Sequence, residues 1–213
     1  MDNRINIIVV ITMVILSVTG CSRKHSKNIT GDNNVIGSGN TYFPLSNGNS
    51  WIYETINPGN SGLNAISTLT VTAEIFFGIE TFYENLTHEY ISGGSVSERD
   101  YIYMSNDTLY ASQPSTPDWY VLYILKDDSS LVGNTFFADL TSSGDVVTHY
   151  MVDNDVDVNV PAGSFTNCLH YRRTIFSVIT YVTDIYFAPN VGPIYFYVDQ
   201  EVDCEMKLVD FNQ

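Results

Sequence analysis

The sequence predicts an all-β protein, mainly antiparallel, in which a meander of strands curls into a half-barrel or a barrel. Three observations predict this fold. Apolar and polar residues alternate with period two in several segments after residue 50, as they do in strands with one buried face. Turn residues separate the segments at short intervals. No segment shows a persuasive apolar period of 3.6 residues. A sandwich of two β-sheets is the alternative that fits the same pattern.

The first 20 residues have the character of a secretory signal. Arg4 supplies a positive charge, and Ile5–Leu16 is an apolar run broken only by Asn6 and Thr12. A helix that spans a bilayer needs about 20 apolar residues, and this run is shorter. We therefore expect residues 1–20 to be a signal peptide. A membrane-spanning anchor and an ordinary cleaved signal that leaves a thiol behind are the alternatives.

The end of this signal resembles the lipobox of bacterial lipoproteins. Val18, Thr19 and Gly20 precede Cys21, and these small or modest side chains suit the signal peptidase of that class. The resemblance implies cleavage before Cys21, whose thiol would carry a diacylglycerol and whose new amino group would be acylated. We expect a lipid anchor in the membrane of the bacterial cell envelope. Ser22 is not the aspartate that retains some lipoproteins on the inner membrane, which favours the outer membrane.

The composition divides the rest of the chain into a tether and a domain. Residues 21–41 contain no aromatic residue and are rich in Asn, Gly, Ser and Lys, so they cannot bury enough apolar surface to fold. All 28 aromatic residues lie between Tyr42 and Phe211. We expect a lipidated cysteine with a flexible tether over residues 21–41 and a single antiparallel β domain over residues 42–213.

The domain begins with turn residues and then gives one strand signal after another. Asn47-Gly48 is a turn before Trp51, and the clearest alternation covers Thr68–Phe77. Trp119–Leu125 is almost wholly apolar, which predicts a central strand covered on both faces. Asp127–Phe137 is the only segment where a short helix fits. We expect strands over residues 51–53, 68–77, 80–91, 101–105, 108–111, 119–125, 146–160, 166–174, 178–187, 194–198 and 202–211.

The charge of the domain excludes nucleic acid as a partner. From residue 28 onward there are five basic residues against 23 acidic ones, a balance of −18. Nucleic-acid binding needs a basic surface that neutralises phosphates. The remaining basic cluster, Arg23, Lys24 and Lys27, lies beside the lipid site, where an anionic membrane surface would attract it. No cofactor motif is present, and the protein partners are not readable from the sequence.

Cys168 and Cys204 form an even pair in a compartment that permits disulfides, so they could form a bridge. In the predicted strands Cys204 shares a face with apolar residues, whereas Cys168 alternates out of phase with Leu169 and Tyr171. Two separate buried thiols are the alternative.

Asp153, Asp155 and Asp157 place three carboxylates on one face of a predicted strand, and they begin like a calcium-binding loop. The pattern then fails, because Val158 stands where that loop needs glycine and Ser164 where it needs a glutamate. The three aspartates are therefore a weak candidate metal site, and a solvated strand face is the stronger interpretation.

Three segments resemble a group of uncharacterised bacterial lipoproteins. Residues 42–53 contain a YFPL opening followed by GNSWIY, residues 158–165 read VNVPAGSF, and residues 186–194 read YFAPNVGPI. Such proteins are distantly similar to the half-barrel carriers that move lipoproteins through the periplasm, in which an antiparallel sheet curls around a hydrophobic cavity. The resemblance implies a β half-barrel and assigns no chemistry to any residue.

The sequence contains no recognisable catalytic constellation, and we expect the protein not to be an enzyme. The leading hypothesis is a non-catalytic module that binds a lipid or another hydrophobic or amphipathic ligand, and the alternative is an envelope structural or protein-interaction lipoprotein without a small ligand. Arg172 and Arg173 should point to opposite faces of one strand. We expect the buried one to pair with a carboxylate.

Overall fold

The computed structural model describes residues 42–57, 65–77, 80–91, 94–105, 107–113, 116–140, 145–199 and 203–213. These residues form twelve strands and one short 3₁₀ helix. In chain order the elements are β1 (Ser50–Ile56), β2 (Ala65–Phe77), β3 (Glu80–Ile91), β4 (Gly94–Ser105), β5 (Thr108–Gln113), β6 (Thr116–Ile124), η2 (Ser129–Leu131), β7 (Thr135–Leu140), β8 (Val146–Val160), β9 (Gly163–Phe176), β10 (Thr180–Ala188), β11 (Gly192–Asp199) and β12 (Cys204–Asn212).

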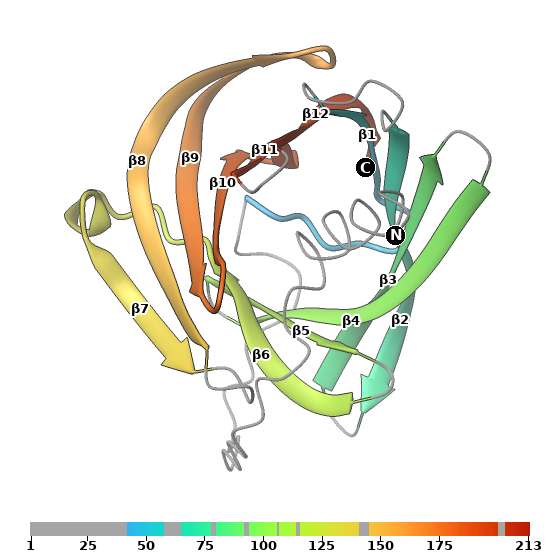
Figure 1. The fold of residues 1–213 in the computed structure, drawn as a ribbon. Coiled ribbons are helices and arrows are strands. Elements are labelled where there is room, and N and C mark those ends of the chain that lie inside the picture. The colour runs from blue at the N-terminus through green and yellow to red at the C-terminus, as the bar shows by residue number, and fades with distance from the viewer. Residues whose placement is uncertain are drawn as a thin grey trace.

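All twelve strands belong to one antiparallel sheet with the order β6-β5-β4-β3-β2-β1-β12-β11-β10-β9-β8-β7. Strands that follow one another in the chain pair as neighbours, except β6 and β7. The first strand pairs with the last, and β6 and β7 are the two edges. Figure 1 shows this sheet curled around a common interior. The predicted meander and its half-barrel are confirmed, and the two-sheet sandwich is not formed.

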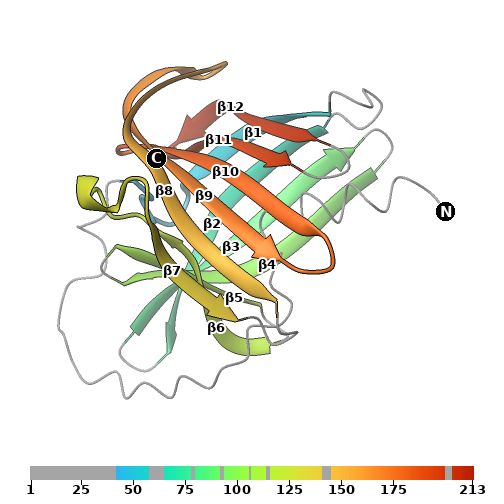
Figure 2. The same cartoon turned by 60° about the vertical axis from the view of Figure 1, so that its left-hand side comes forward.

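The longest strands, β8 and β9, form a hairpin that extends beyond the rest of the sheet and bends over the end of the barrel (Figures 1 and 2). The bend brings the hairpin turn to the last strand, where the backbone N–H of Ala162 donates to the carbonyl of Leu208 at 3.0 Å. The rings of Phe165 and Phe211 lie 6.2 Å apart beside this contact. Register shifts along β8 between Met151 and Val158 account for the bend, because bulges curve a strand.

The core lies inside the curled sheet, because alternate side chains of the strands point inward. In β1, Trp51, Tyr53 and Thr55 are buried while the residues between them are partly exposed. β9 alternates in the same way from Leu169 to Ile175. The largest fully buried side chains come from seven different strands and the segment after β6: Trp51, Tyr53, Tyr171, Phe187, Leu109, Leu125, Met151, Leu169, Ile185, Ile194 and Met206.

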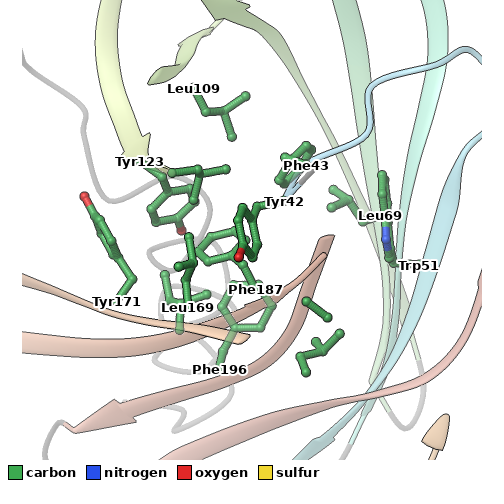
Figure 3. Close-up of a cluster of buried hydrophobic side chains, with 14 of the residues drawn as sticks. Tyr42, Phe43, Trp51, Leu69, Leu109, Tyr123, Leu169, Tyr171, Phe187 and Phe196 are labelled. Carbon is green, nitrogen blue, oxygen red and sulfur yellow. The ribbon is translucent and has the colours of Figure 1, made fainter. Parts of the chain in front are cut away.

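The segment before β1 runs through the barrel interior instead of along its outside. Tyr42 and Phe43 are buried between opposite walls of the barrel, and Figure 3 shows them among side chains from several strands. The Tyr42 phenol donates to the carbonyl of Asn167 at 3.3 Å. At the other end of the segment, the N–H of Gly48 donates to the Val71 carbonyl at 2.8 Å. The YFPL opening is therefore an internal filling of the barrel.

Three details differ from the sequence-based expectations. β6 is an edge strand and not a central one. Its Leu122 and Tyr123 side chains are buried because the sheet curls and Tyr171 and Phe187 pack against Tyr123. β7 is an additional strand, and its short apolar stretch lies in the segment where a helix fits the sequence pattern. The helix that does form there is only η2, capped by Asp128, whose carboxylate accepts from the N–H of Ser130 at 3.0 Å.

Residues 1–41, which include the expected signal peptide, the tether, Cys21 and its preceding residues, lie outside the described residues. Within the described part of the chain, no helix has the length and apolar character needed to cross a bilayer.

Candidate functional site

Two of the sequence motifs meet in the structure and close one side of the barrel. The indole N–H of Trp51 donates to the carbonyl of Val191 at 2.5 Å, and the phenol of Tyr53 donates to the carbonyl of Pro193 at 2.8 Å. Gly192, between these carbonyls, has φ +107°, and a Cβ atom there would lie 3.1 Å from the Trp51 ring nitrogen. The two motifs therefore form a structural junction of the barrel.

The barrel wall is interrupted where its two edge strands, β6 and β7, face each other. We call this interruption the seam. Among the described residues no backbone ladder joins these strands, and side chains cross the seam instead. The ring of Tyr171 on β9 lies 5.6 Å from that of Tyr123 on β6 and 6.0 Å from that of Phe136 on β7, both edge to face. The backbone N–H of Ile124 donates to the Tyr171 phenol. Tyr171 is thus the residue that connects both sides of the seam.

Four buried polar side chains lie together behind the seam: Tyr123, His149, Tyr171 and Arg173. We call them the interior polar cluster. His149 and Arg173 are partners across the β8–β9 ladder, and His149 Nδ1 is hydrogen-bonded to the Tyr171 phenol. His149 is 1% exposed and Arg173 is 3% exposed. Among the side chains that the structure describes, Arg173 is the buried one that carries a formal charge at neutral pH.

The surroundings keep the other three members of the cluster neutral. Burial lowers the pKa of His149 to about 3, and the nearby positive charge of Arg173 contributes. Burial raises the pKa of Tyr123 to about 12 and that of Tyr171 well above its ordinary value, although Arg173 opposes both shifts. Within the cluster, Arg173 is therefore the charged member, and the other three are neutral hydrogen-bonding groups.

The outer face of the same strands carries a separate polar group. As expected, Arg172 and Arg173 point to opposite faces. The outward Arg172 forms an ion pair, in which its Nε and one terminal guanidinium nitrogen donate to the two Asp184 oxygens at 2.8 and 2.9 Å. His170 Nε2 lies 2.9 Å from the same carboxylate. Burial raises the pKa of Asp184, but the hydrogen bonds from His170 and Arg172 outweigh it and lower the pKa.

A row of rings crosses the outer face next to this ion pair. His170 stacks on Tyr186 with 4.2 Å between centroids, and Tyr186 lies 5.4 Å from Tyr195. The ammonium of Lys207 lies 5.9 Å from the Tyr195 ring. These residues are cross-strand partners on four consecutive strands. His170 and Tyr186 are stacked and Tyr186 and Tyr195 are tilted, so each ring packs against the next and the row stabilises the sheet.

The three aspartates considered for calcium lie on the exposed face of β8. Asp153, Asp155 and Asp157 are exposed, and the residues between them are half-buried. One Asp153 oxygen accepts from the backbone N–H of Asn154 at 2.7 Å and from that of Asp155 at 3.2 Å. No three His, Cys, Asp or Glu side chains in the described part of the chain converge as metal ligands would. The geometry is that of a solvated strand face.

The disulfide considered between Cys168 and Cys204 is not present, and both residues are buried thiols. The register explains why. β9 and β12 are separated by β10 and β11, and the residue of β9 at the level of Cys204 is Arg173, five positions away from Cys168. Three strand spacings alone amount to about 14 Å, while a disulfide needs Cα atoms within about 7 Å. Burial, with a contribution from Asp157, raises the pKa of Cys168 to about 11.

Comparison with solved structures identifies the same fold in other bacterial proteins. A protein from Bacteroides fragilis, described as exported and as having a YmcC-like fold, matches with a TM-score of 0.55 and 15% identity, over 82% of this chain and 100% of its own. A protein from Parabacteroides distasonis, described as a lipoprotein, matches with a TM-score of 0.58 and 15% identity, over 82% of this chain and 99% of its own. At this identity the likeness establishes the fold alone.

No family model matches the chain, and no curated protein matches its sequence. The fold alone defines the class, which is an antiparallel β half-barrel.

The interior polar cluster was not predicted as a site, although the sequence contains a signal for it. Arg173 interrupts an otherwise apolar inward stripe between Leu169 and Ile175, and His149 interrupts a similar stripe between Val147 and Met151. The tyrosines that complete the cluster come from β6 and β9, and only the curl of the sheet brings those strands together.

Proposed function

We propose that this protein is a lipid-anchored lipoprotein of the bacterial cell envelope, in the outer membrane, whose half-barrel binds a hydrophobic or amphipathic ligand without catalysing a reaction. Two kinds of observation support the envelope assignment. Val18–Cys21 resembles a lipobox, and proteins of the same fold are described as exported and as a lipoprotein. The anchor would hold the domain at the membrane surface, where amphipathic molecules are concentrated.

The observation that carries the binding proposal is the seam. It interrupts the wall of a barrel whose interior is lined by aromatic side chains such as Tyr123, Tyr171 and Phe187. Opening the seam breaks ring contacts and a few side-chain hydrogen bonds, whereas opening the wall elsewhere breaks a backbone ladder. Each hydrogen bond of such a ladder contributes about 1 kcal/mol, so the seam is the easiest way into the interior.

Native mass spectrometry tests this proposal. The chain from Ser22 to Gln213, which keeps every described residue, is secreted to the periplasm and purified without detergent. We expect a stoichiometric adduct that solvent extraction identifies as a lipid, and its reappearance when the stripped protein is incubated with total envelope lipid. A mass without adduct in both samples contradicts the binding proposal.

The filled interior favours a second function, that of an envelope structural or protein-interaction lipoprotein without a small ligand. Tyr42, Phe43 and Leu45 occupy space between the barrel walls that a ligand would otherwise use. A protein that never acquires an adduct, and whose thermal midpoint does not change with added lipid, would favour this alternative.

The anchor is tested separately from the ligand. Radiolabelled palmitate should label the wild-type protein and a Ser22→Ala variant, and both should sediment with outer-membrane vesicles in a density gradient. A Cys21→Ser variant should lose the label and leave the membrane fraction. Labelling of the Cys21→Ser variant contradicts the assignment of the lipidated residue.

A further inference from the structure

The turn between β9 and β10 carries exposed apolar side chains. Phe176, Val178 and Ile179 are 49%, 101% and 45% exposed, and all residues from 176 to 180 are exposed. Val146 of β8, the cross-strand partner of Phe176, is exposed as well. Turns usually contain Gly, Asn, Asp, Pro or Ser, so the turn itself does not require a valine and an isoleucine. We call Val146, Phe176, Val178 and Ile179 the apolar tip.

The apolar tip gathers exposed apolar side chains that are otherwise scattered. In the described part of the chain six large apolar side chains are exposed, and four of them form the apolar tip. Residues 174–183 contain no charged residue, in a domain that is strongly negative. Asp145, directly before Val146, is half-buried at the edge of this uncharged region. A single exposed apolar residue is ordinary, but a group of them marks an interaction site.

The apolar tip and the bent end of the β8–β9 hairpin lie at opposite ends of the barrel. β9 begins in the bent hairpin at Gly163 and ends at the tip with Phe176. β8 runs between the same two ends in the reverse direction, from Val146 to Val160. Figure 2 shows the β9–β10 turn and the bent hairpin pointing away from each other. A surface that contacts the tip therefore leaves the bent hairpin on the far side of the barrel.

The apolar tip is small, which favours a lipid bilayer over a protein as the surface that it contacts. A stable protein interface takes about 20–30 residues from each partner, many more than the tip offers. Apolar side chains at the end of a hairpin can instead enter the boundary of the acyl region while the charged surface stays in water. The length of the chain permits this contact. Residues 22–41 span at most about 70 Å, so a domain anchored through Cys21 can reach the bilayer with either end.

We propose that the apolar tip inserts into the surface of a lipid bilayer and orients the anchored barrel, with the β9–β10 turn towards the membrane and the bent β8–β9 hairpin away from it. This inference goes beyond the proposed function, which brings the domain to a membrane through Cys21 and leaves its orientation open. The tip is too small to replace the lipid anchor, because even a whole myristoyl chain gives only marginal membrane binding. It therefore orients the domain and does not hold it.

Fluorescence quenching by spin-labelled lipid measures which end of the barrel meets the membrane. The chain from Ser22 to Gln213 is attached by an N-terminal polyhistidine to phosphatidylcholine vesicles that contain a nickel-chelating lipid. Ser177→Cys and Ser164→Cys place the same environment-sensitive fluorophore near the two ends of β9, at serines that are both exposed. Cys168 and Cys204 remain unlabelled because both are buried.

The two labels should respond differently to the bilayer. Phosphatidylcholine with a spin label in the upper part of its acyl chain should quench the fluorophore at Ser177→Cys, whose emission should also shift to shorter wavelengths. The fluorophore at Ser164→Cys should show neither change, because it lies at the end of the barrel that faces away. Equal quenching of the two labels overturns the proposal.

Two exposed valines provide a matched pair of variants in the Ser177→Cys chain. Val178→Asp places a carboxylate on the tip, where burial in lipid is costly, and should abolish both the quenching and the wavelength shift. Val209→Asp places the same charge at the other end of the barrel, next to Leu208 where the bent hairpin is bonded, and should leave both unchanged. Because Val178 is fully exposed, its substitution should not alter the circular dichroism of the protein. Quenching that persists in Val178→Asp overturns the proposal.

The experiment separates failure of this inference from failure of the proposed function. The polyhistidine takes the place of the lipid, so the result does not depend on acylation of Cys21, which palmitate labelling tests by itself. A second copy of the chain is the other surface that the tip could contact, and analytical ultracentrifugation detects it. If the chain forms a dimer that Val178→Asp dissociates, and the Ser177→Cys label is not quenched on vesicles, the tip is an interface between copies and the proposal is wrong.

Discussion

At the residue scale, the most constrained contact lies between Gly192 and the ring of Trp51. The φ of +107° at Gly192 is one that residues with a side chain rarely adopt, and a Cβ atom would lie 3.1 Å from the indole nitrogen. That nitrogen is held by its hydrogen bond to Val191, so the ring cannot move away without breaking a buried contact. The packing of this ring explains why glycine stands between the two motif carbonyls.

Replacing Gly192 by alanine should therefore destabilise the protein through two effects, backbone strain and the clash with Trp51. Gly48→Ala is the matched control, because Gly48 has φ +95° and a Cβ atom there would meet no heavy atom of the described structure within 4 Å beyond its chain neighbours. We expect a loss of about 1–3 kcal/mol for the control and a larger loss for Gly192→Ala. Urea unfolding measures both. Equal losses would show that the Trp51 contact imposes no constraint.

His149 should make the stability depend on pH. Its pKa is about 3 in the folded protein and 6.5 when exposed, so between these values the unfolded chain binds a proton that the folded protein does not. Stability from this group is therefore complete above pH 6.5 and is lost as the pH falls towards 3, by at most about 1.4 kcal/mol per pH unit.

His149→Gln should flatten this part of the pH profile, measured as the free energy of unfolding in urea from neutral pH down to the acid range. The ion pair of Asp184 on the outer face also weakens in acid, because its pKa is lowered in the folded state, but it does so at lower pH. A profile with the wild-type slope in His149→Gln would contradict the assignment to His149.

At the element scale, the seam is the feature that sets this barrel apart from a closed one. β6 and β7 share no ladder in the described part of the chain, and contacts of the Tyr171 side chain join them.

The strands themselves were largely predictable from the sequence. The alternation of valines with aspartates predicted β8, and the inward and outward faces follow it as expected. The place of a strand in the sheet was less predictable, and β6 shows why. Leu122, Tyr123 and Leu125 of its apolar run are buried by packing across the curled interior and not by a neighbouring strand on each side.

Tyr171→Phe tests the connection across the seam. The variant keeps the ring contacts and removes the hydroxyl, so His149 and the Ile124 N–H each lose a partner in a buried place. We expect a loss of about 1–3 kcal/mol and faster amide hydrogen exchange at Ile124. Tyr186→Phe, on the half-buried outer face, is the control and should change the stability by less than about 0.5 kcal/mol. Unchanged exchange at Ile124 in Tyr171→Phe would mean that the hydroxyl does not secure the seam.

At the scale of the whole molecule, one pairing joins two six-stranded meanders, β1–β6 and β7–β12, into one curled sheet. Every ladder of the sheet except the one between β1 and β12 joins strands that follow one another in the chain. Hairpins can be predicted from local sequence patterns. The pairing of the first strand with the last cannot, because the alternation in β1 and β12 is equally compatible with a sandwich. For the same reason the interior polar cluster could be recognised residue by residue, as polar interruptions at His149 and Arg173, but not as a site. His149, Tyr171 and Arg173 meet within the β8–β9 hairpin, but Tyr123 of β6 joins them only after the first and last strands have paired.

Leu208 is the residue through which the pairing of β1 with β12 can be tested. It is fully buried, pairs with Tyr53 of the first strand, and its carbonyl accepts from Ala162 of the arching hairpin. Truncating it to alanine should cost about 2–5 kcal/mol, because it leaves a cavity where three parts of the barrel meet. Val209→Ala is the matched control: the next residue is 37% exposed and lies at the register shift, so its truncation should cost little.

The measurement is urea unfolding of chains that carry Trp119→Phe, so that Trp51 is the single tryptophan, followed by both tryptophan fluorescence and far-ultraviolet circular dichroism. If β1–β12 pairing holds both halves of the sheet together, Leu208→Ala should lower the midpoint of both signals equally, because Trp51 lies at the junction and the strands lie throughout the sheet. A fluorescence change that precedes the loss of strand signal would show that the sheet survives opening of this pairing. The pairing of β1 with β12 would then be a local contact, and the whole fold would not depend on it.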